Sequence, residues 1–193
     1  MSGSGKSTLA TALAQELRIA LYDADNLHPK SNIEKMSRGE PLSDADREPW
    51  LELVRATAEH ACAEQQGREP ETELKGVIIA CSALKKRYRD ILRGIHLPSA
   101  VRNHLEAPRF HTLPTYIVFI SGPRELLAER MNSRTGHFMT TALLDSQLQT
   151  LESPEGEEGV ITVRLEDTTA TQVRLVKEQL HSLLRGRADC HVS

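Results

Sequence analysis

The chain has 193 residues, of which 39% are hydrophobic, 26% charged and only 4% aromatic. This balance suits a globular domain with an aliphatic core and excludes disordered, collagenous and coiled-coil chains. The formal net charge of −3 gives the surface no general attraction to nucleic acid or to anionic membranes. The sequence contains no long apolar run, no signal-peptide pattern and no CxxC pair, which favours a reducing, cytoplasmic location.

Hydrophobic periodicity predicts alternating helices and strands along the chain. In order, we expect a helix over 6–17, a strand over 19–22, a helix over 30–37, a longer helix from Ser43, a strand over 77–80, a helix over 84–92, a strand over 116–120, helices over 123–133 and 142–151, a strand over 160–165 and a helix over 171–184. Asp46 stands three residues after Ser43, as in a capping box.

The predicted strands are apolar without alternation, and each is followed by a helix. This pattern is typical of an α/β fold in which a parallel sheet is covered by helices on both faces. We therefore expect a single domain over 1–185, followed by a polar tail at 186–193. The segment at about 94–115 has three prolines and no clear period, so we interpret it as a surface insertion.

The first residues contain most of a phosphate-binding loop. They are Ser2, Gly3, Ser4, Gly5, Lys6, Ser7 and Thr8. In the pattern GxxxxGK[ST], backbone amides and a helix N-terminus hold phosphate oxygens, the lysine meets the β- and γ-phosphates, and the hydroxyl binds Mg²⁺. Gly5, Lys6 and Ser7 fit the second half of the pattern, and a helix follows at once. A linker rich in serine and glycine is the alternative interpretation.

The pattern is incomplete at its start. Its first glycine would stand one residue before Met1, and the strand that should deliver the loop is missing as well. Neighbouring strands then lack a hydrogen-bonding partner, and each unpaired buried backbone group costs roughly 1–3 kcal/mol. We therefore expect a truncated gene model, a short isoform or a poorly active form, and we expect an added strand and glycine to change stability and turnover.

Two carboxylates, Asp23 and Asp25, follow the strand predicted over 19–22, at the end where open α/β sheets bind ligands. One can reach Mg²⁺ through water, while the other accepts a proton from a hydroxyl of the acceptor substrate. A helix cap or a turn is the alternative. The strand over 77–80 is followed by Cys81 instead of the aspartate that commonly serves Mg²⁺, so we assign the metal role to Asp23.

Arg130 and Arg134 are spaced i, i+4, so both guanidinium groups can point the same way on one helix. With Gly136 as a hinge, they suit a mobile lid over about 124–140 that closes on the transferring phosphate. A solvated basic face is the alternative. His28 extends the loop of Asp25, and a lone histidine is more often structural.

With these residues, the chain strongly resembles the gluconokinases, the thermoresistant gluconate kinase family of phosphate-loop kinases. The matching blocks are SGSGKST (2–8), DADNLHP (23–29), NIEKMSRGEPLSDADREPWL (32–51), CSALKKRYRDILR (81–93), RMNSRTGHF (130–138) and SQLQTLESP (146–154). The resemblance implies a phosphate-loop kinase fold and ATP-dependent phosphorylation of D-gluconate at its 6-hydroxyl. The product, 6-phosphogluconate, would feed the pentose phosphate pathway.

The resemblance also implies roles for individual residues. Those expected to act in catalysis are Lys6, Asp25, Arg130 and Arg134. Those expected to contact gluconate are Asp25, His28, Arg47, Arg89, His137 and Gln147. The loop from Ser2 to Thr8 would bind ATP, Ser7 and Asp23 would serve Mg²⁺, and about 166–168 would lie near adenine. Family members often form homodimers, and no nucleic-acid or membrane partner is expected.

Two other functions remain open from the residues alone. The same fold could phosphorylate another small polar acceptor, for instance shikimate or a nucleoside monophosphate, and a panel of acceptors would separate these. The incomplete phosphate loop could also make the chain a ligand-binding protein without catalysis. Nucleotide titration would separate that case, because acceptor binding without ATP binding would favour it.

Overall fold

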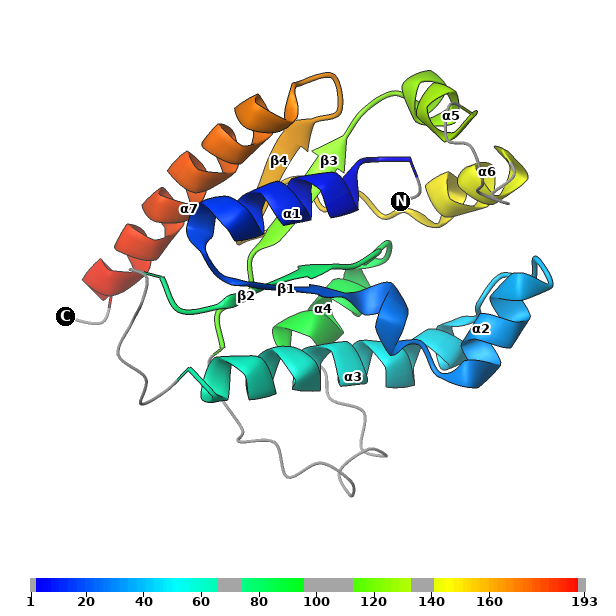
Figure 1. Ribbon diagram of the computed structural model, residues 1–193, viewed down its shortest axis with the longest axis horizontal. Coiled ribbons are helices and arrows are strands. Elements are labelled where there is room, and N and C mark those ends of the chain that lie inside the picture. The colour runs from blue at the N-terminus through cyan, green and yellow to red at the C-terminus, as the bar shows by residue number, and fades with distance from the viewer. Residues whose placement is uncertain (1–2, 66–73, 96–112, 133–140, 191–193) are drawn as a thin grey trace. The chain divides into compact units, whose positions relative to one another are not determined.

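Figure 1 presents the computed structural model, which describes residues 3–65, 74–95, 113–132 and 141–190. The chain divides into two compact units. The first, here called the terminal unit, consists of Met1–Leu13 together with Thr115–Ser193. The second, the middle unit, is Ala14–Pro114. Helix α1 (Lys6–Leu17) begins in the terminal unit and ends in the middle unit.

The middle unit contains a pair of parallel strands together with several helices. Its elements are β1 (Ala20–Asp23), the 3₁₀ helix η1 (Ala24–Leu27), α2 (Lys30–Ser37), α3 (Asp44–Ala63), β2 (Val77–Ala80) and α4 (Lys86–Arg93). Strands β1 and β2 pair from Ala20 opposite Val77 to Asp23 opposite Ala80. Helix α3 lies against α4 and β2 (Figure 1).

Helix α3 starts at a capping box and supplies half of the core cluster of the middle unit. The Ser43 hydroxyl accepts a hydrogen bond from the Asp46 amide, while the Asp46 carboxylate accepts one from the Ser43 amide. Apolar residues then recur at helical spacing and meet side chains of α4 and η1. The resulting cluster consists of Ala24, Trp50, Leu51, Val54, Tyr88 and Ile91. This core fixes the segment that follows β1.

The terminal unit repeats the combination of parallel strands and helices. Besides the start of α1, its elements are β3 (Ile117–Ser121), α5 (Arg124–Asn132), α6 (Thr141–Thr150), β4 (Val160–Arg164) and α7 (Thr169–Cys190). Strands β3 and β4 pair from Ile117 opposite Val160 to Ser121 opposite Arg164, and α7 packs against β4. Helices α5 and α6 are joined by a bidentate ion pair between Arg124 and Asp145, with distances of 2.6 and 2.9 Å.

The α/β class with parallel strands is confirmed, and the predicted helices and strands are present. Sequence periodicity did not predict η1, and α7 continues to Cys190, into residues that were predicted to form a tail. In the described residues the strands form two separate pairs, β1–β2 and β3–β4, and no strand precedes the phosphate loop. The predicted lid over 124–140 is described only to Asn132, and most of the insertion at 94–115 lies outside the described residues.

None of the helices in the described part of the chain combines the length and the apolar character that crossing a bilayer requires.

Candidate active site

The phosphate loop is built on two glycines with left-handed backbone conformations. Gly3 has φ of +75° and Gly5 has φ of +83°, a region that side-chain-bearing residues rarely adopt. A Cβ atom on Gly3 would lie only 2.8 Å from Met131 Cγ and 2.9 Å from the Leu127 carbonyl oxygen. Helix α1 then begins at Lys6. A glycine turn that leads directly into a helix N-terminus is the arrangement that binds phosphate oxygens.

A cavity of about 310 Å³ opens beside this loop within the terminal unit. Its lining residues come from the phosphate loop, from α5, from the turn after β4 and from the start of α7; they are Gly3, Ser4, Gly5, Thr8, Arg130, Asp167, Thr168, Thr169 and Gln172. Asp167 and Thr168 belong to the segment predicted to lie near adenine. Thr169 and Gln172 were not predicted as site residues. They lie in the C-terminal third of the chain, which resembles the family only weakly and contains no motif that would single them out.

Arg130 is bonded to the turn after β4 and lies near the phosphate loop. Its Nη2 donates a hydrogen bond of 2.7 Å to the Leu165 carbonyl oxygen. Its Nη1 lies 3.8 Å from the position that a Cβ atom on Gly5 would occupy. The guanidinium is therefore anchored on one side and faces the loop that would hold phosphate. This placement fits the predicted role of Arg130 in stabilising negative charge, and that role stays a prediction.

Other predicted residues of the terminal unit can be placed less fully. Arg134 and His137 lie outside the described residues. Gln147 is half-buried on α6, and Ser7 and Thr8 are exposed in the first turn of α1. The predicted contacts of these side chains with substrate or metal therefore remain predictions.

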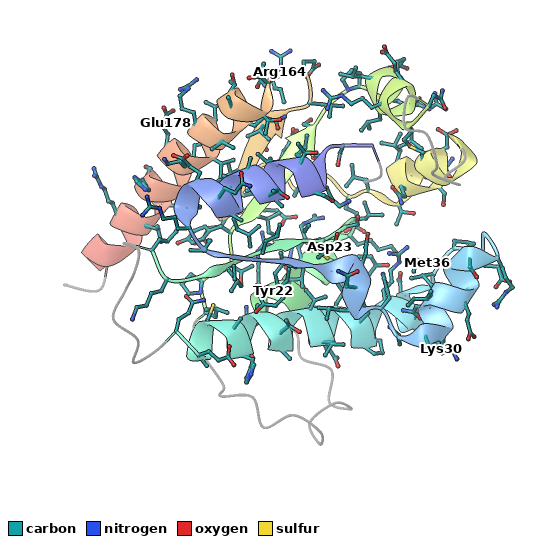
Figure 2. All side chains as sticks on the ribbon, viewed as in Figure 1. Tyr22, Asp23, Lys30, Met36, Arg164 and Glu178 are labelled. Carbon is teal, nitrogen blue, oxygen red and sulfur yellow. The ribbon has the colours of Figure 1, made fainter. Side chains whose placement is uncertain are left out.

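Asp23 and Asp25 lie at the carboxyl end of β1, where Figure 2 labels Asp23. Asp23 is the N-cap of η1, and its Oδ1 accepts a hydrogen bond of 3.0 Å from the Asp25 amide. Asp25 itself is exposed on the first turn of η1. The cap that was considered as an alternative is thus present, and it occupies one oxygen of Asp23 while it presents Asp25 to solvent.

The buried side chain of Trp50 fixes the segment that follows β1. Trp50 Nε1 donates a hydrogen bond of 2.8 Å to the Ala24 carbonyl oxygen, and the indole ring stacks on the imidazole of His28 with centroids 4.1 Å apart. His28 Nδ1 lies 3.3 Å from the amide nitrogen of Asn32. Burial lowers the pKa of His28, a change that the Asp25 charge opposes and the Arg47 charge reinforces. His28 is therefore a packed side chain whose uncharged form is favoured.

Polar side chains from α3 and α4 surround the ring of Tyr88. Lys85 Nζ lies 2.7 Å from Asp44 Oδ1, and the Tyr88 hydroxyl donates a short hydrogen bond to the same oxygen. These two donors lower the pKa of Asp44, whereas burial and the bond to Asp44 raise the pKa of Tyr88. The Arg47 guanidinium carbon lies 5.8 Å from the centre of the Tyr88 ring. Arg47 is thus positioned by a cation–π contact beside a paired, charged group.

Arg89 is almost completely buried, with 1% of its surface exposed. Its Nη1 donates hydrogen bonds of 3.1 Å to the carbonyl oxygens of Ala83 and Leu84. These bonds fix the loop between β2 and α4. The contact between Arg89 and gluconate stays a prediction. The sequence did not reveal that Arg89 also stabilises this loop.

The donors available for a divalent cation are few. No group of three or more histidine, cysteine, aspartate or glutamate side chains in the described residues could hold a metal ion on its own. Mg²⁺ is usually bound by one or two protein ligands together with substrate phosphates and water. The predicted ligands are the Ser7 hydroxyl of the terminal unit and the Asp23 carboxylate of the middle unit, and each assignment remains a prediction.

Comparison with known proteins extends over most of the chain. The sequence profile described as shikimate kinase matches residues 2–158. A gluconokinase of Gluconobacter oxydans is 42% identical over 163 residues, which cover 84% of this chain and 78% of that protein. The thermoresistant gluconokinase of Escherichia coli is 36% identical over 183 residues, which cover 92% and 90%. The chain belongs to the gluconokinase family.

Solved structures of similar proteins agree with this membership of the gluconokinase family. A crystal structure of a gluconokinase from Sinorhizobium meliloti is 38% identical with a TM-score of 0.68, covering 99% of this chain and 91% of that one. A sugar kinase from Janibacter has 36% identity and a TM-score of 0.72, covering 92% and 88%. This chain is therefore a phosphate-loop kinase, a phosphotransferase that uses a nucleotide and a small-molecule substrate.

Proposed function

We propose that this chain transfers the γ-phosphate of ATP to the 6-hydroxyl of D-gluconate, which yields 6-phosphogluconate and ADP in the cytoplasm. The observation that carries the proposal is the match to gluconokinases at 36–42% identity over at least 84% of the chain. The shikimate kinase profile, which runs from residue 2 to residue 158, also includes both the phosphate loop and the polar segment around Asp25.

The terminal unit supplies the nucleotide side of the proposal. The glycine turn at Gly3 and Gly5 and the cavity beside it support binding of a triphosphate there. In the proposal, Lys6 and Arg130 offset negative charge on the transferring group, and Ser7 binds Mg²⁺. When bound, the ion would neutralise charge on the β- and γ-phosphate oxygens.

The middle unit supplies the acceptor side. Asp25 is exposed next to a fixed cap, so its carboxylate is free to orient the 6-hydroxyl and accept its proton. Gluconate carries one carboxylate and several hydroxyl groups, and it needs both cationic and neutral donors. Arg47 and His28 provide one of each in this unit, and Arg89 is retained in the proposal as a third contact.

The decisive experiment measures ADP release with Mg²⁺–ATP and a panel of acceptors. We expect release with D-gluconate and much less with shikimate, nucleoside monophosphates or the corresponding aldoses. Shikimate is included because the matching family profile has that name. Preferential turnover of shikimate would overturn the choice of acceptor. Gluconate binding without any nucleotide binding in calorimetric titrations would instead favour a protein without catalytic activity.

A further inference from the structure

The amide of Asn32 determines which nitrogen of His28 carries the proton. Asn32 Nδ2 donates a hydrogen bond of 2.8 Å to the Asp46 carbonyl oxygen, and a carbonyl oxygen can only accept. This contact identifies the atom as the amide nitrogen. The same nitrogen lies 3.3 Å from His28 Nδ1, so its second hydrogen is directed at that ring atom. Because an N–H group cannot accept, Nδ1 must be the unprotonated nitrogen.

The surroundings of the ring leave one tautomer. One face of the imidazole stacks on Trp50 at an interplanar angle of 15°, and the histidine is only 9% exposed. Asn32 is itself buried, with 3% of its surface exposed, so its amide cannot turn toward water. Burial also lowers the pKa of His28 despite the nearby Asp25 charge, which disfavours a proton on both nitrogens. A neutral ring with Nδ1 as acceptor carries its hydrogen on Nε2.

We propose that Asn32 is a positioning residue that holds His28 as a neutral imidazole with its proton on Nε2, and that this N–H donates a hydrogen bond to an oxygen of the acceptor substrate. In the described residues Nε2 has no hydrogen-bond partner. The second half of the proposal rests on the proposed function, since it needs a polyhydroxy acid as ligand. An uncharged donor can serve a hydroxyl or a carboxylate oxygen without a change of protonation.

The first test reads the tautomer directly in the wild-type chain. Long-range ¹H–¹⁵N NMR correlations distinguish a ring protonated on Nε2 from one protonated on Nδ1 or on both nitrogens, and the His28→Gln spectrum assigns the signals. We expect the Nε2–H pattern at pH 7, before any substrate is added. A ring protonated on Nδ1, or a charged ring, would overturn the proposal whatever the enzyme phosphorylates.

The second test changes the partner of the ring. Asn32→Asp places an acceptor opposite Nδ1, so we expect the proton to move from Nε2 to Nδ1, which leaves Nε2 without a hydrogen to donate. The KM for gluconate should then rise about tenfold, a ratio typical of one lost hydrogen bond, while kcat and the KM for ATP change little. Ser31→Asp is the matched control, because it adds the same charge at the adjacent, exposed position and should leave the tautomer and the KM unchanged.

Two substitutions of His28 distinguish its role as a hydrogen-bond donor from its role in packing. His28→Gln keeps a neutral N–H donor, whereas His28→Ala removes it, so the first variant should retain a lower KM for gluconate than the second. Equal KM values for the two variants would contradict the donor role. Absence of gluconate turnover in the wild type would overturn the proposed function instead, and it would leave the tautomer measurement valid.

Discussion

The buried side chain of Trp50 fixes the backbone next to the exposed side chain of Asp25. Its indole N–H bonds to the Ala24 carbonyl oxygen, and Ala24 lies between the two aspartates of the loop. The backbone that carries Asp25 is therefore fixed, although the Asp25 side chain is exposed. Because the backbone is fixed, less conformational entropy is lost when the Asp25 carboxylate meets the acceptor hydroxyl.

Replacement of Asp25 by asparagine tests the proposed proton acceptor. Asp25→Asn keeps the size of the side chain but removes its basicity, so we expect kcat to fall by roughly 10²–10⁴-fold. The affinity for ATP should change little, because this residue belongs to the proposed acceptor side. Steady-state kinetics and ATP titration measure the two effects. Glu34→Gln, an equal loss of charge at an exposed position of α2, is the control, and an unchanged kcat in Asp25→Asn would remove the residue from its role.

Gly3 cannot take a side chain without distortion of the phosphate loop. In Gly3→Ala the new methyl group would meet Met131 and the Leu127 backbone in a left-handed conformation. We expect ATP binding to weaken at least tenfold in calorimetric titrations, since strain of this kind costs of order 1–3 kcal/mol. Gly156→Ala is matched for backbone strain, with φ of +85° and open space around it, and it should keep wild-type affinity. Similar losses in both variants would show that strain alone explains the effect.

At the level of elements, the start of α3 is a second point where local chemistry supports the site. The helix carries both Arg47 and Trp50, so its first turn determines how these side chains are presented. Ser43 and Asp46 close that turn reciprocally, and Lys35 Nζ adds a contact of 2.6 Å to the Asp46 carboxylate. The hydrogen bond from Lys35, followed by those from Ser43, holds the pKa of Asp46 well below its usual range. Their stabilising effect is therefore complete above the ordinary pKa of an aspartate and is lost progressively as the pH falls below it.

Loss of the Ser43 cap should destabilise the middle unit. Ser43→Ala removes the acceptor for the Asp46 amide, and such a change costs about 1 kcal/mol of unfolding free energy. Urea denaturation followed by circular dichroism measures the difference. Ser31→Ala is the control, since Ser31 is exposed within α2. Equal midpoints for the two variants would contradict the contribution of the cap.

The end of β3 packs too closely on the end of β4 for any residue but glycine. A Cβ atom on Gly122 would lie 2.3 Å from Leu165 Cβ, so Gly122→Ala forces the backbone apart. We expect a loss of about 1–3 kcal/mol in denaturation experiments. Gly186→Ala is the contrasting control, because this glycine stands inside α7 with nothing within 4 Å of the new methyl. That variant should gain roughly 0.5 kcal/mol from helix propensity.

Across the whole molecule, the described strands form small sheets that have only two members each. In the described residues β1 pairs only with β2, and β3 pairs only with β4. Each pair has few hydrogen bonds of its own, and two-stranded sheets are only marginally stable without further support. The helices of each unit provide that support by covering the strands with apolar side chains, as α7 does for β4 and α3 for β2.

We expect a strand added before the phosphate loop to pair with a strand that is already present. We expect a chain extended by about five apolar residues and a terminal glycine to melt at a higher temperature and to bind ATP more tightly, because the added backbone groups form ladder hydrogen bonds. Thermal unfolding and ATP titration of the two chains measure the effect. A polar extension of equal length is the control. Equal behaviour of the original and the apolar-extended chains would contradict the expectation.

By itself, the sequence determined the α/β class, the position of nearly every helix and strand, and the resemblance to gluconokinases. These features depend on local periodicity, capping residues and contiguous motifs, all of which can be read along the chain. The helix from Ser43 and the helix after Gly5 are examples, since both begin where their capping or loop residues predict. The 3₁₀ helix after Asp23 was not predicted, because it is too short to show a period.

The side-chain contacts that support the site could be seen only in the folded chain. Asn32 bonds to Asp46 and lies against His28, Trp50 bonds to Ala24, and Arg89 fixes two carbonyl groups of the loop after β2. The bonds from Asn32 to Asp46 and from Trp50 to Ala24 join residues 14 and 26 positions apart, so spacing along the chain does not predict them. His28 and Asn32 are only four residues apart, and Arg89 lies five and six residues from its partners, but which atoms these side chains contact depends on how they are packed. The sequence could name His28, but the protonation of its ring is decided by a neighbour that only folding places beside it.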